Sequence, residues 1–291
     1  MSRLCSDNLL ELLKIHKIGR RYMKYRLIAL DLDGTLNNDK KIITRRTKEA
    51  LIAVQKKGVI VVLASGRPIT GLKRESEALQ LEKYNGILLS YNGGKVVDAN
   101  SKQVLYKKSL PNETAVKLLK HIEDFPVTPI VEDGKQYYTT SKDEFMIEFE
   151  SNLNSLGVKE VDNVAAAVDF SPIKILIAAP NDVLVPSSKQ IMEPFKSELS
   201  FVQSTPFYLE ATMKGINKAS SLQAVCDKMN ISPEEVIAFG DEHNDIKMIE
   251  FAGLGVAMGN ACQQLKAVAD EITLSNNEDG IAHILEKYYE L

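Results

Sequence analysis

The sequence predicts an α/β fold, in which a Rossmann-like core with a parallel sheet carries an inserted α+β segment. Apolar runs at 26–30, 59–64 and 86–90 alternate with helical stretches, as in right-handed βαβ units. The alternation stops after about residue 107 and resumes near residue 210. One chain of 291 residues is long enough for both a core and an inserted domain.

The first part of the core is expected to begin with a buried strand at 26–30. Thr44 is a suitable N-cap for a helix that runs to about Lys57, and Gly58 is suited to end it. The continuous β-branched run 59–64 reads as a strand covered on both faces. We expect the remaining elements to be a helical stretch through 81, a strand at 86–90 and a hairpin at 95–108 that turns at 100–101.

The middle of the chain, 108–209, mixes short strands and helices and is predicted to be the α+β domain. Pro180 and Pro186 are expected to break the chain there. The expected helices are 113–123, 143–156 and 187–198, and the expected strands are 128–131, 136–140 and 173–179.

The core is predicted to comprise residues 23–107 and 210–291. Its second part contains a capping box with proline at the first helical position, at 232–235. Expected helices are 220–229, 245–252, 260–269 and 280–290, with strands at 236–239, 255–257 and 271–274.

Residues 1–22 form a separate N-terminal extension in this prediction. Ser6 or Asp7 could cap a short helix that is followed by basic residues, a pattern that can lie on a membrane surface. We favour a non-essential extension, because Met23 lies directly before the first core strand.

Composition limits the classes of partner. The chain is 44% hydrophobic and 26% charged, with a net charge of −3, as in ordinary soluble proteins. The absence of a basic excess argues against nucleic acid as a partner, and no apolar run reaches the length of a membrane span. Three widely spaced cysteines fit a reducing cytoplasm better than a disulfide framework or a zinc site.

The most informative motif is Asp31-Leu32-Asp33-Gly34-Thr35, directly after the first strand. Side chains two residues apart point the same way from a strand, so Asp31 and Asp33 are expected to lie side by side and to repel each other. A divalent cation would relieve the repulsion, and carboxylate ligands suit Mg²⁺. Gly34 allows a sharp turn, and Thr35 can support it. The alternative is an ordinary solvated turn.

Further polar residues follow other strands of the predicted sheet. Ser65 and Gly66 offer a hydroxyl and backbone N–H groups to phosphate oxygens, and Lys218 offers a positive charge. Asp241 could complete a metal's oxygen shell, and Asn244 could donate to a phosphoryl oxygen. Each alone could be a helix cap or a solvated side chain, but ligands bind at the carboxyl ends of parallel strands, where most of these residues fall.

This ordered set resembles the haloacid dehalogenase (HAD) superfamily of phosphohydrolases. The segment inserted between the third strand and Lys218 looks like the α+β cap of its Cof-type members, a sugar-phosphate phosphatase family. Asn92-Gly93 and the run 255–261 also match that family. The likeness covers nearly the whole chain from Met23, with one departure, since Ala219 stands where glycine is common.

The resemblance implies a mechanism and a set of roles. Asp31 would form an aspartyl-phosphate, and Asp33 would be the general acid and base. The implied ligands of Mg²⁺ are Asp31, the main-chain carbonyl of Asp33, and Asp241, with Asp245 supporting that shell from behind. The implied substrate-binding residues are Leu32 and Gly66 through their N–H groups, together with Ser65, Asn244 and Lys218. Cap hinges are expected near Lys108 and Glu210.

The expected function is therefore a cytoplasmic, Mg²⁺-dependent phosphatase of small phosphorylated metabolites such as sugar phosphates, acting as a monomer or homodimer. A phosphotransferase or mutase of the same superfamily, or a non-catalytic binding protein that retains the fold, remains open. We do not expect a metal role for His243, and the glycines at 253–259 have the wrong spacing for a dinucleotide loop.

Overall fold

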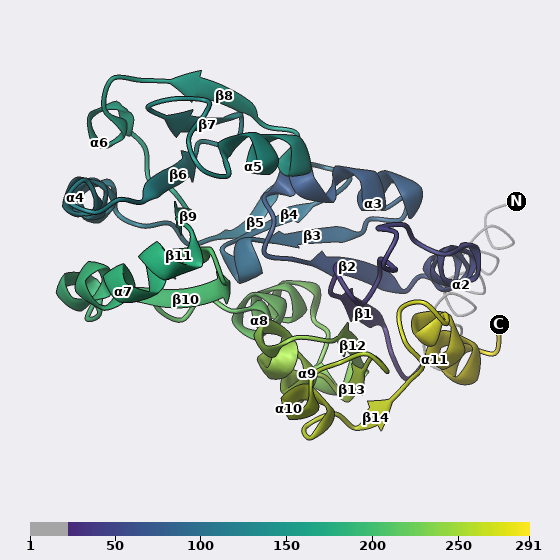
Figure 1. The fold of residues 1–291 in the computed structure, drawn as a ribbon. Coiled ribbons are helices and arrows are strands. Elements are labelled where there is room, and N and C mark those ends of the chain that lie inside the picture. The colour runs from purple at the N-terminus through teal and green to yellow at the C-terminus, as the bar shows by residue number, and fades with distance from the viewer. Residues whose placement is uncertain (1–22) are drawn as a thin grey trace, which may run out of the picture.

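The computed structural model describes residues 23–291, in which the chain forms two β-sheets (Figure 1). The predicted extension at 1–22 lies outside the described residues. The first sheet has eight strands in the order β14-β13-β12-β1-β2-β3-β4-β5, and the second has six in the order β10-β11-β9-β6-β7-β8. The predicted α/β class with a parallel core sheet is confirmed.

The first sheet places β1 (Leu27–Leu30) at its centre, between β12 (Val236–Gly240) and β2 (Ile60–Ala64). Neighbouring strands are parallel from β14 to β3, and β4 and β5 continue the sheet antiparallel. All residues of β1 and β12 are buried, as expected for strands with helices on both faces. The other strands of this sheet are β3 (Ile87–Ser90), β4 (Lys95–Asp98), β5 (Val104–Lys107), β13 (Leu254–Ala257) and β14 (Glu271–Ile272).

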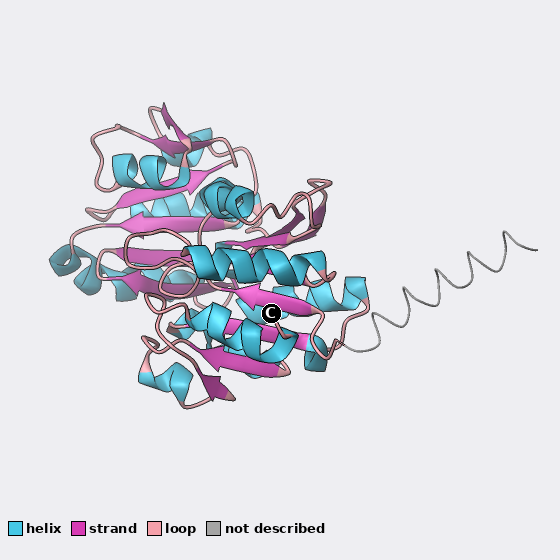
Figure 2. Ribbon diagram, turned by 90° about the vertical axis from the view of Figure 1, so that its right-hand side faces the viewer, coloured by secondary structure: helices cyan, strands magenta, loops and turns pink. Residues whose placement is uncertain are grey.

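Helices lie in front of and behind the strands of this sheet (Figure 2). The predicted N-cap is present in α2 (Arg45–Lys56), where the Thr44 side chain accepts a hydrogen bond from the N–H of Thr47. The last helix, α11 (Gly280–Tyr289), packs against α2. The remaining helices of this region are η1 (Ile69–Leu72), α3 (Lys73–Ala78), η2 (Tyr91–Gly93), α8 (Lys218–Met229), η4 (Pro233–Glu235), η5 (His243–Asp245), α9 (Ile246–Phe251) and α10 (Gln263–Lys266). The capping box predicted at Ser232 is confirmed, whereas α10 is shorter than predicted.

The second sheet is built by the chain between β5 and α8. Its strands are β6 (Thr128–Glu132), β7 (Gln136–Thr139), β8 (Gly157–Glu160), β9 (Lys174–Ala178), β10 (Leu199–Thr205) and β11 (Tyr208–Met213). Its helices are α4 (Asn112–Ile122), α5 (Ile147–Asn154), α6 (Val164–Ala167), α7 (Asn181–Met192) and η3 (Glu193–Phe195). We call this region the cap and the first sheet with its helices the core.

Several details of the cap differ from the sequence prediction. The elements β8, α6, β10 and β11 were not predicted, and α5 is shorter than expected. β11 continues past residue 210, where the prediction restarts the core, and it stays in the cap sheet up to Met213.

The prediction that Pro186 breaks the chain is wrong, because this residue lies inside α7. Proline removes a helical hydrogen bond and normally disfavours a helix interior. Here Leu184 and Ile191 of the same helix are buried in the cap's hydrophobic cluster. Packing of this face stabilises the helix despite the missing bond.

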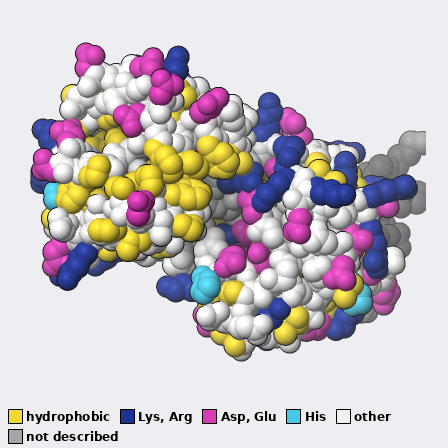
Figure 3. Space-filling view, in the orientation of Figure 1, with side chains coloured by type: hydrophobic (Ala, Val, Ile, Leu, Met, Phe, Trp, Pro, Cys, Tyr) yellow, Lys and Arg dark blue, Asp and Glu magenta, His cyan; other side chains and the backbone are white. Residues whose placement is uncertain are grey.

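The core and the cap have separate hydrophobic centres. One cluster fills the space around β1, β2 and β12, and two others lie against the cap sheet. Figure 3 shows the two lobes with a hollow between them, and hydrophobic side chains gather on the lobe that carries β10 and β11. Among residues 23–291, no helix is long and apolar enough to span a bilayer.

Candidate active site

The register of the core sheet brings the predicted polar motifs to one edge. Leu30 of β1 lies opposite Leu63 of β2 and Phe239 of β12. Asp31, Ser65 and Asp241 are each the first residue after one of these strands, so they emerge at neighbouring strand ends. A parallel sheet opens its ligand site at this carboxyl edge.

Lys218 joins this edge from a distant part of the sequence. It is the first residue of α8, whose N-cap is Asn217, and its side chain is fully buried. The Nζ atom donates to Asp31 Oδ1 and, at 2.6 Å, to Asp245 Oδ1. Burial would lower the pKa of Lys218, but the charges of Asp245 and Asp31 outweigh it and raise that pKa. The lysine is therefore a fixed positive charge.

Three buried carboxylates surround this lysine. One oxygen from each of Asp31, Asp241 and Asp245 lies within 4.8 Å of the others. Burial raises the pKa of Asp31 well above its ordinary value, against the charge of Lys218, and the charges of Asp245 and Asp241 raise it further. Burial also raises the pKa of Asp241 to about 6, although a hydrogen bond from Thr35 acts in the opposite direction. The cluster thus holds more negative charge than one lysine balances.

The hydrogen bonds divide these carboxylates into two kinds. Asp245 accepts from Lys218 on Oδ1, and its Oδ2 accepts from the N–H groups of Asp241 and Glu242, each at 3.1 Å. Asp31 and Asp241 each keep an oxygen without a protein partner in the described part of the chain. Oxygens of this type are the ligands that Mg²⁺ prefers, so the donor set fits this ion.

Gly34 allows the first loop to approach Asp241. Its φ is +87°, and a Cβ atom there would lie 2.2 Å from Asp241 Oδ2. Thr35 Oγ1 donates to Asp241 Oδ1 at 2.6 Å. Thr35, expected only to support its own turn, thus also joins the two acidic loops.

The carboxylate of Asp33 has different partners from that of Asp31. Arg67 binds it through Nε at 3.0 Å and Nη2 at 2.7 Å, and Lys41 Nζ lies 2.9 Å from Oδ1. Burial would raise the pKa of Asp33, but Arg67 and Lys41 outweigh it and hold that pKa below its ordinary value. The side chain of Asp33 is absent from the acidic cluster around Lys218, although the sequence analysis placed it beside Asp31. β1 ends at Leu30, so the alternation of a strand does not extend to Asp33.

Arg67 and Lys41 were missed as partners of Asp33. Arg67 lies in the recognised motif with Ser65 and Gly66, but nothing in the spacing showed that it reaches the first loop. Long side chains such as these can contact many positions.

Backbone N–H groups are available near these side chains. In the part of the chain that the structure describes, the N–H groups of Leu32 and Gly66 have no protein acceptor. The Ser65 side chain is buried and its Oγ accepts from the N–H of Arg67 at 3.2 Å. Asn244 is exposed and donates to Asn92 Oδ1 at 3.0 Å.

The cap reaches this edge through Lys174 on β9, another residue that the sequence analysis missed. Its Nζ lies 3.3 Å from the carbonyl oxygen of Gly66 and 3.3 Å from Glu210 Oε1. A second link joins Tyr91 of the core to Glu132 of the cap. These contacts place one face of the cap sheet opposite the core loops.

The chain is similar to known hydrolases over most of its length. A family model described as haloacid dehalogenase-like hydrolase matches residues 28–285. The 5-amino-6-(5-phospho-D-ribitylamino)uracil phosphatase YcsE of Bacillus subtilis is 30% identical over 278 residues, with 93% of this chain and 98% of that protein covered.

Two solved structures show the same architecture. A haloacid dehalogenase-like hydrolase from Bacteroides thetaiotaomicron has a TM-score of 0.87 and 38% identity, covering 91% of this chain and all of that one. The subclass IIB sugar phosphatase BT4131 has a TM-score of 0.76 and 26% identity, over 91% of this chain and 100% of its own. Because the family model extends from the first core strand into the last helix, the chain belongs to the haloacid dehalogenase-like hydrolases, and the expectation that it is an enzyme is confirmed.

Proposed function

We propose that the protein is a Mg²⁺-dependent phosphatase of small phosphorylated metabolites, including sugar phosphates, that works through an aspartyl-phosphate. The observation that carries this proposal is the buried Lys218 between Asp31 and Asp245, beside Asp241. It combines a nucleophile, a fixed cation and oxygen ligands at the carboxyl edge of the sheet. The phosphatase names of YcsE and BT4131 support the same reaction class.

Asp31 is the proposed nucleophile. One of its carboxylate oxygens bonds to phosphorus, and the bond from phosphorus to the leaving alkoxide breaks. Lys218 keeps the other oxygen in place. Mg²⁺, held by Asp31, Asp241 and the main-chain carbonyl of Asp33, would neutralise charge on the phosphoryl oxygens.

Asp33 is the proposed acid and base. It gives a proton to the leaving alkoxide and then takes one from the water that hydrolyses the aspartyl-phosphate. With Arg67 and Lys41 bound to it, Asp33 is ionised, the state that a base requires. Displacement of these cations by an incoming substrate would raise the pKa of Asp33 and favour the acid form.

The proposed phosphate cradle consists of the N–H groups of Leu32 and Gly66 together with Ser65, Asn244 and Lys218. The two N–H groups have no protein acceptor among residues 23–291, which leaves them able to bind phosphoryl oxygens. Asp245 would hold Lys218 and the backbone of Asp241 in position.

The cap is proposed to select small substrates and exclude bulk water. We propose that the core comprises 23–107 with the chain after β11, and that the cap hinges lie at Lys108 and at the loop after Met213. Lys108 Nζ binds the carbonyl oxygen of Lys214 at 2.6 Å, so the two connections lie together. The predictions of a cytoplasmic location and of a monomer or homodimer remain predictions.

The test is phosphate release from p-nitrophenyl phosphate with Mg²⁺ and with a chelator. We expect turnover that requires Mg²⁺ and is abolished in Asp31→Asn, while Asp162→Asn, a change on the exposed surface of the cap, leaves it unchanged. A folded Asp31→Asn protein that keeps a tenth of the wild-type rate would refute the nucleophile assignment. Transfer of the phosphoryl group to a second sugar hydroxyl, without phosphate release, would instead identify a phosphotransferase or mutase.

A further inference from the structure

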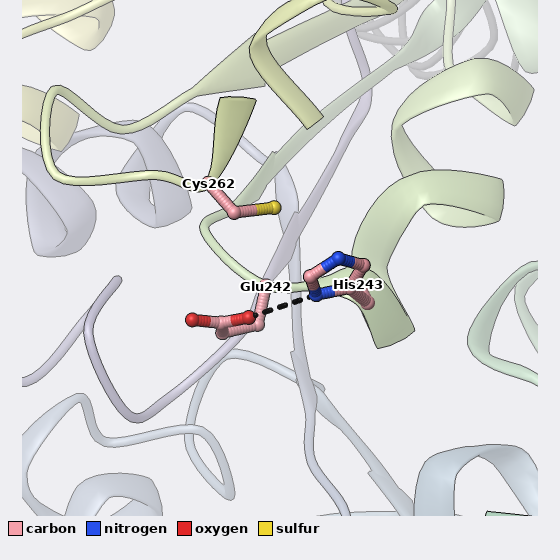
Figure 4. Close-up of side chains that lie close together, drawn as sticks. All are labelled: Glu242, His243 and Cys262. Atoms are coloured by element: carbon pink, nitrogen blue, oxygen red, sulfur yellow. Dashed lines mark hydrogen bonds and ion pairs between the residues drawn. The ribbon is translucent and has the colours of Figure 1, made fainter. Parts of the chain in front are cut away.

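A second group of metal-binding side chains lies next to the acidic cluster. Glu242 and His243 follow Asp241 after the end of β12, and Cys262 is the residue before α10. One ligand atom from each of the three lies within 4.8 Å of the others. Figure 4 shows these side chains converging from the two loops.

We propose that Glu242, His243 and Cys262 form a binding site for a zinc-like transition-metal ion, distinct from the Mg²⁺ site. A thiolate, an imidazole and a carboxylate are the three kinds of ligand that Zn²⁺ takes in proteins, and water can complete the tetrahedron. Mg²⁺ prefers oxygen ligands alone. The two neighbouring clusters therefore differ in the ion that they select.

The exposure of this group suits an ion that enters from solvent. Glu242 and His243 are exposed and Cys262 is half-buried, so no element has to open. His243 Nδ1 lies 3.2 Å from Glu242 Oε2, and this contact orients the imidazole ring. On binding, the Cys262 thiol would release its proton to solvent and coordinate as the thiolate.

The backbone links this site to Asp241. The N–H of Cys262 donates to the carbonyl oxygen of Asp241 at 2.9 Å, and the N–H of Glu242 donates to Asp245 at 3.1 Å. An ion held here adds positive charge beside the proposed Mg²⁺ ligand and repels a second cation. Provided that the proposed function holds, zinc binding raises the Mg²⁺ concentration needed for half-maximal turnover.

The binding test uses the full chain with Co²⁺ as a spectroscopic probe and Zn²⁺ as a competitor, both in excess Mg²⁺. We expect one ion per chain with a thiolate-to-cobalt charge-transfer band that Zn²⁺ removes. Cys262→Ser should abolish the band, and both Cys262→Ser and His243→Ala should weaken Zn²⁺ binding by about tenfold or more. The matched controls are Cys226→Ala, in the core interior, and His283→Ala, on the exposed face of α11, which should bind as the wild type does.

The outcomes separate this site from the acidic cluster. Binding that persists in Cys262→Ser and is lost in Asp31→Asn would overturn the proposal, as would a wild-type chain that binds no Zn²⁺. Zinc binding that depends on Cys262 in a protein without any phosphatase activity would support this site and count against the proposed function. In an active enzyme, Cys262→Ser should increase the Zn²⁺ concentration needed for half-maximal inhibition about tenfold.

Discussion

The core and the cap line the cleft between them with different structural elements. The core contributes the ends of β1, β2 and β12, where short loops hold acidic, hydroxyl and amide groups. The cap contributes the face of a sheet, from which Lys174 and Glu210 lie close to the core loops. Strand ends fix a few groups rigidly for one chemistry, whereas a sheet face can change its side chains without altering the fold. From this difference we infer that the core determines the type of reaction and the cap the choice of substrate.

The largest effect in this comparison is expected for Lys218→Met, in the core. The change leaves Asp31 and Asp245 buried without their cation, which should lower the free energy of unfolding by about 3–5 kcal/mol. Phosphatase activity should be lost as well. Urea denaturation and phosphate-release assays measure the two effects.

Lys228→Met is the matched control for this change, because Lys228 lies exposed in the last turn of the same helix. We expect its stability and activity to stay at the wild-type level. Equal stability of Lys218→Met and the wild type without Mg²⁺ would contradict the role of the lysine as the cation of this cluster.

Asp241→Asn is expected to change the free energy of unfolding by a smaller amount and to raise it rather than lower it. Burial raises the pKa of Asp241 from an ordinary value of 3.8 to about 6 in the folded state. The folded state therefore binds more protons between these values, and the metal-free protein loses stability as the pH rises from about 4 through 6.

The asparagine amide carries no charge, so the variant avoids the free-energy cost of ionising a buried carboxyl group. Metal-free Asp241→Asn should therefore be more stable than the wild type at pH 7, by on the order of 1–3 kcal/mol. The gain should shrink towards pH 4, and added Mg²⁺ should stabilise the wild type alone. Thermal unfolding at several pH values, with Mg²⁺ and with chelator, measures this. A variant that is less stable than the wild type at pH 7 without metal would show that the ionised Asp241 carboxylate does not destabilise the metal-free protein.

The smallest effect is expected for Lys174→Met, in the cap. The change removes contacts with Gly66 and Glu210 but leaves the groups around Lys218 intact. KM should rise about three- to fivefold, the equivalent of roughly 1 kcal/mol, with kcat nearly unchanged. Steady-state kinetics measure both, with Lys189→Met on the exposed surface of α7 as the control. A fall in kcat with constant KM would show that Lys174 takes part in the chemical step. It would contradict the inference that the cap contributes only to the choice of substrate.

The core was more predictable than the cap for a physical reason. Its strands are continuous apolar runs, and its helix α2 begins at a clear cap, Thr44. The positions of Asp31 and Asp241 follow from such strands, because parallel strands align their ends, whereas Lys218 reaches the same edge from the first position of α8. The sequence therefore led to the acidic cluster.

The cap has weaker signals. β10 and β11 mix apolar and polar residues, and only the alternation at 199–201 and 209–213 could have identified them. Pro186 misled because packing outweighs helix propensity in α7. The ion pairs of Asp33 with Arg67 and Lys41 depend on how long side chains fold across the surface, which no spacing rule encodes.

The loop after β11 connects the cap to the core and also leads directly to Lys218. Residues 214–217 form the connection from the cap back to the core. Lys108 donates a hydrogen bond to the carbonyl oxygen of Lys214 at its start, and it ends at Asn217, directly before the buried Lys218. If the cap rotates about the proposed hinges, the rotation would displace the backbone directly before Lys218. In the proposed mechanism, a substrate that closes the cap would thereby also adjust the position of the Lys218 ammonium group that it meets.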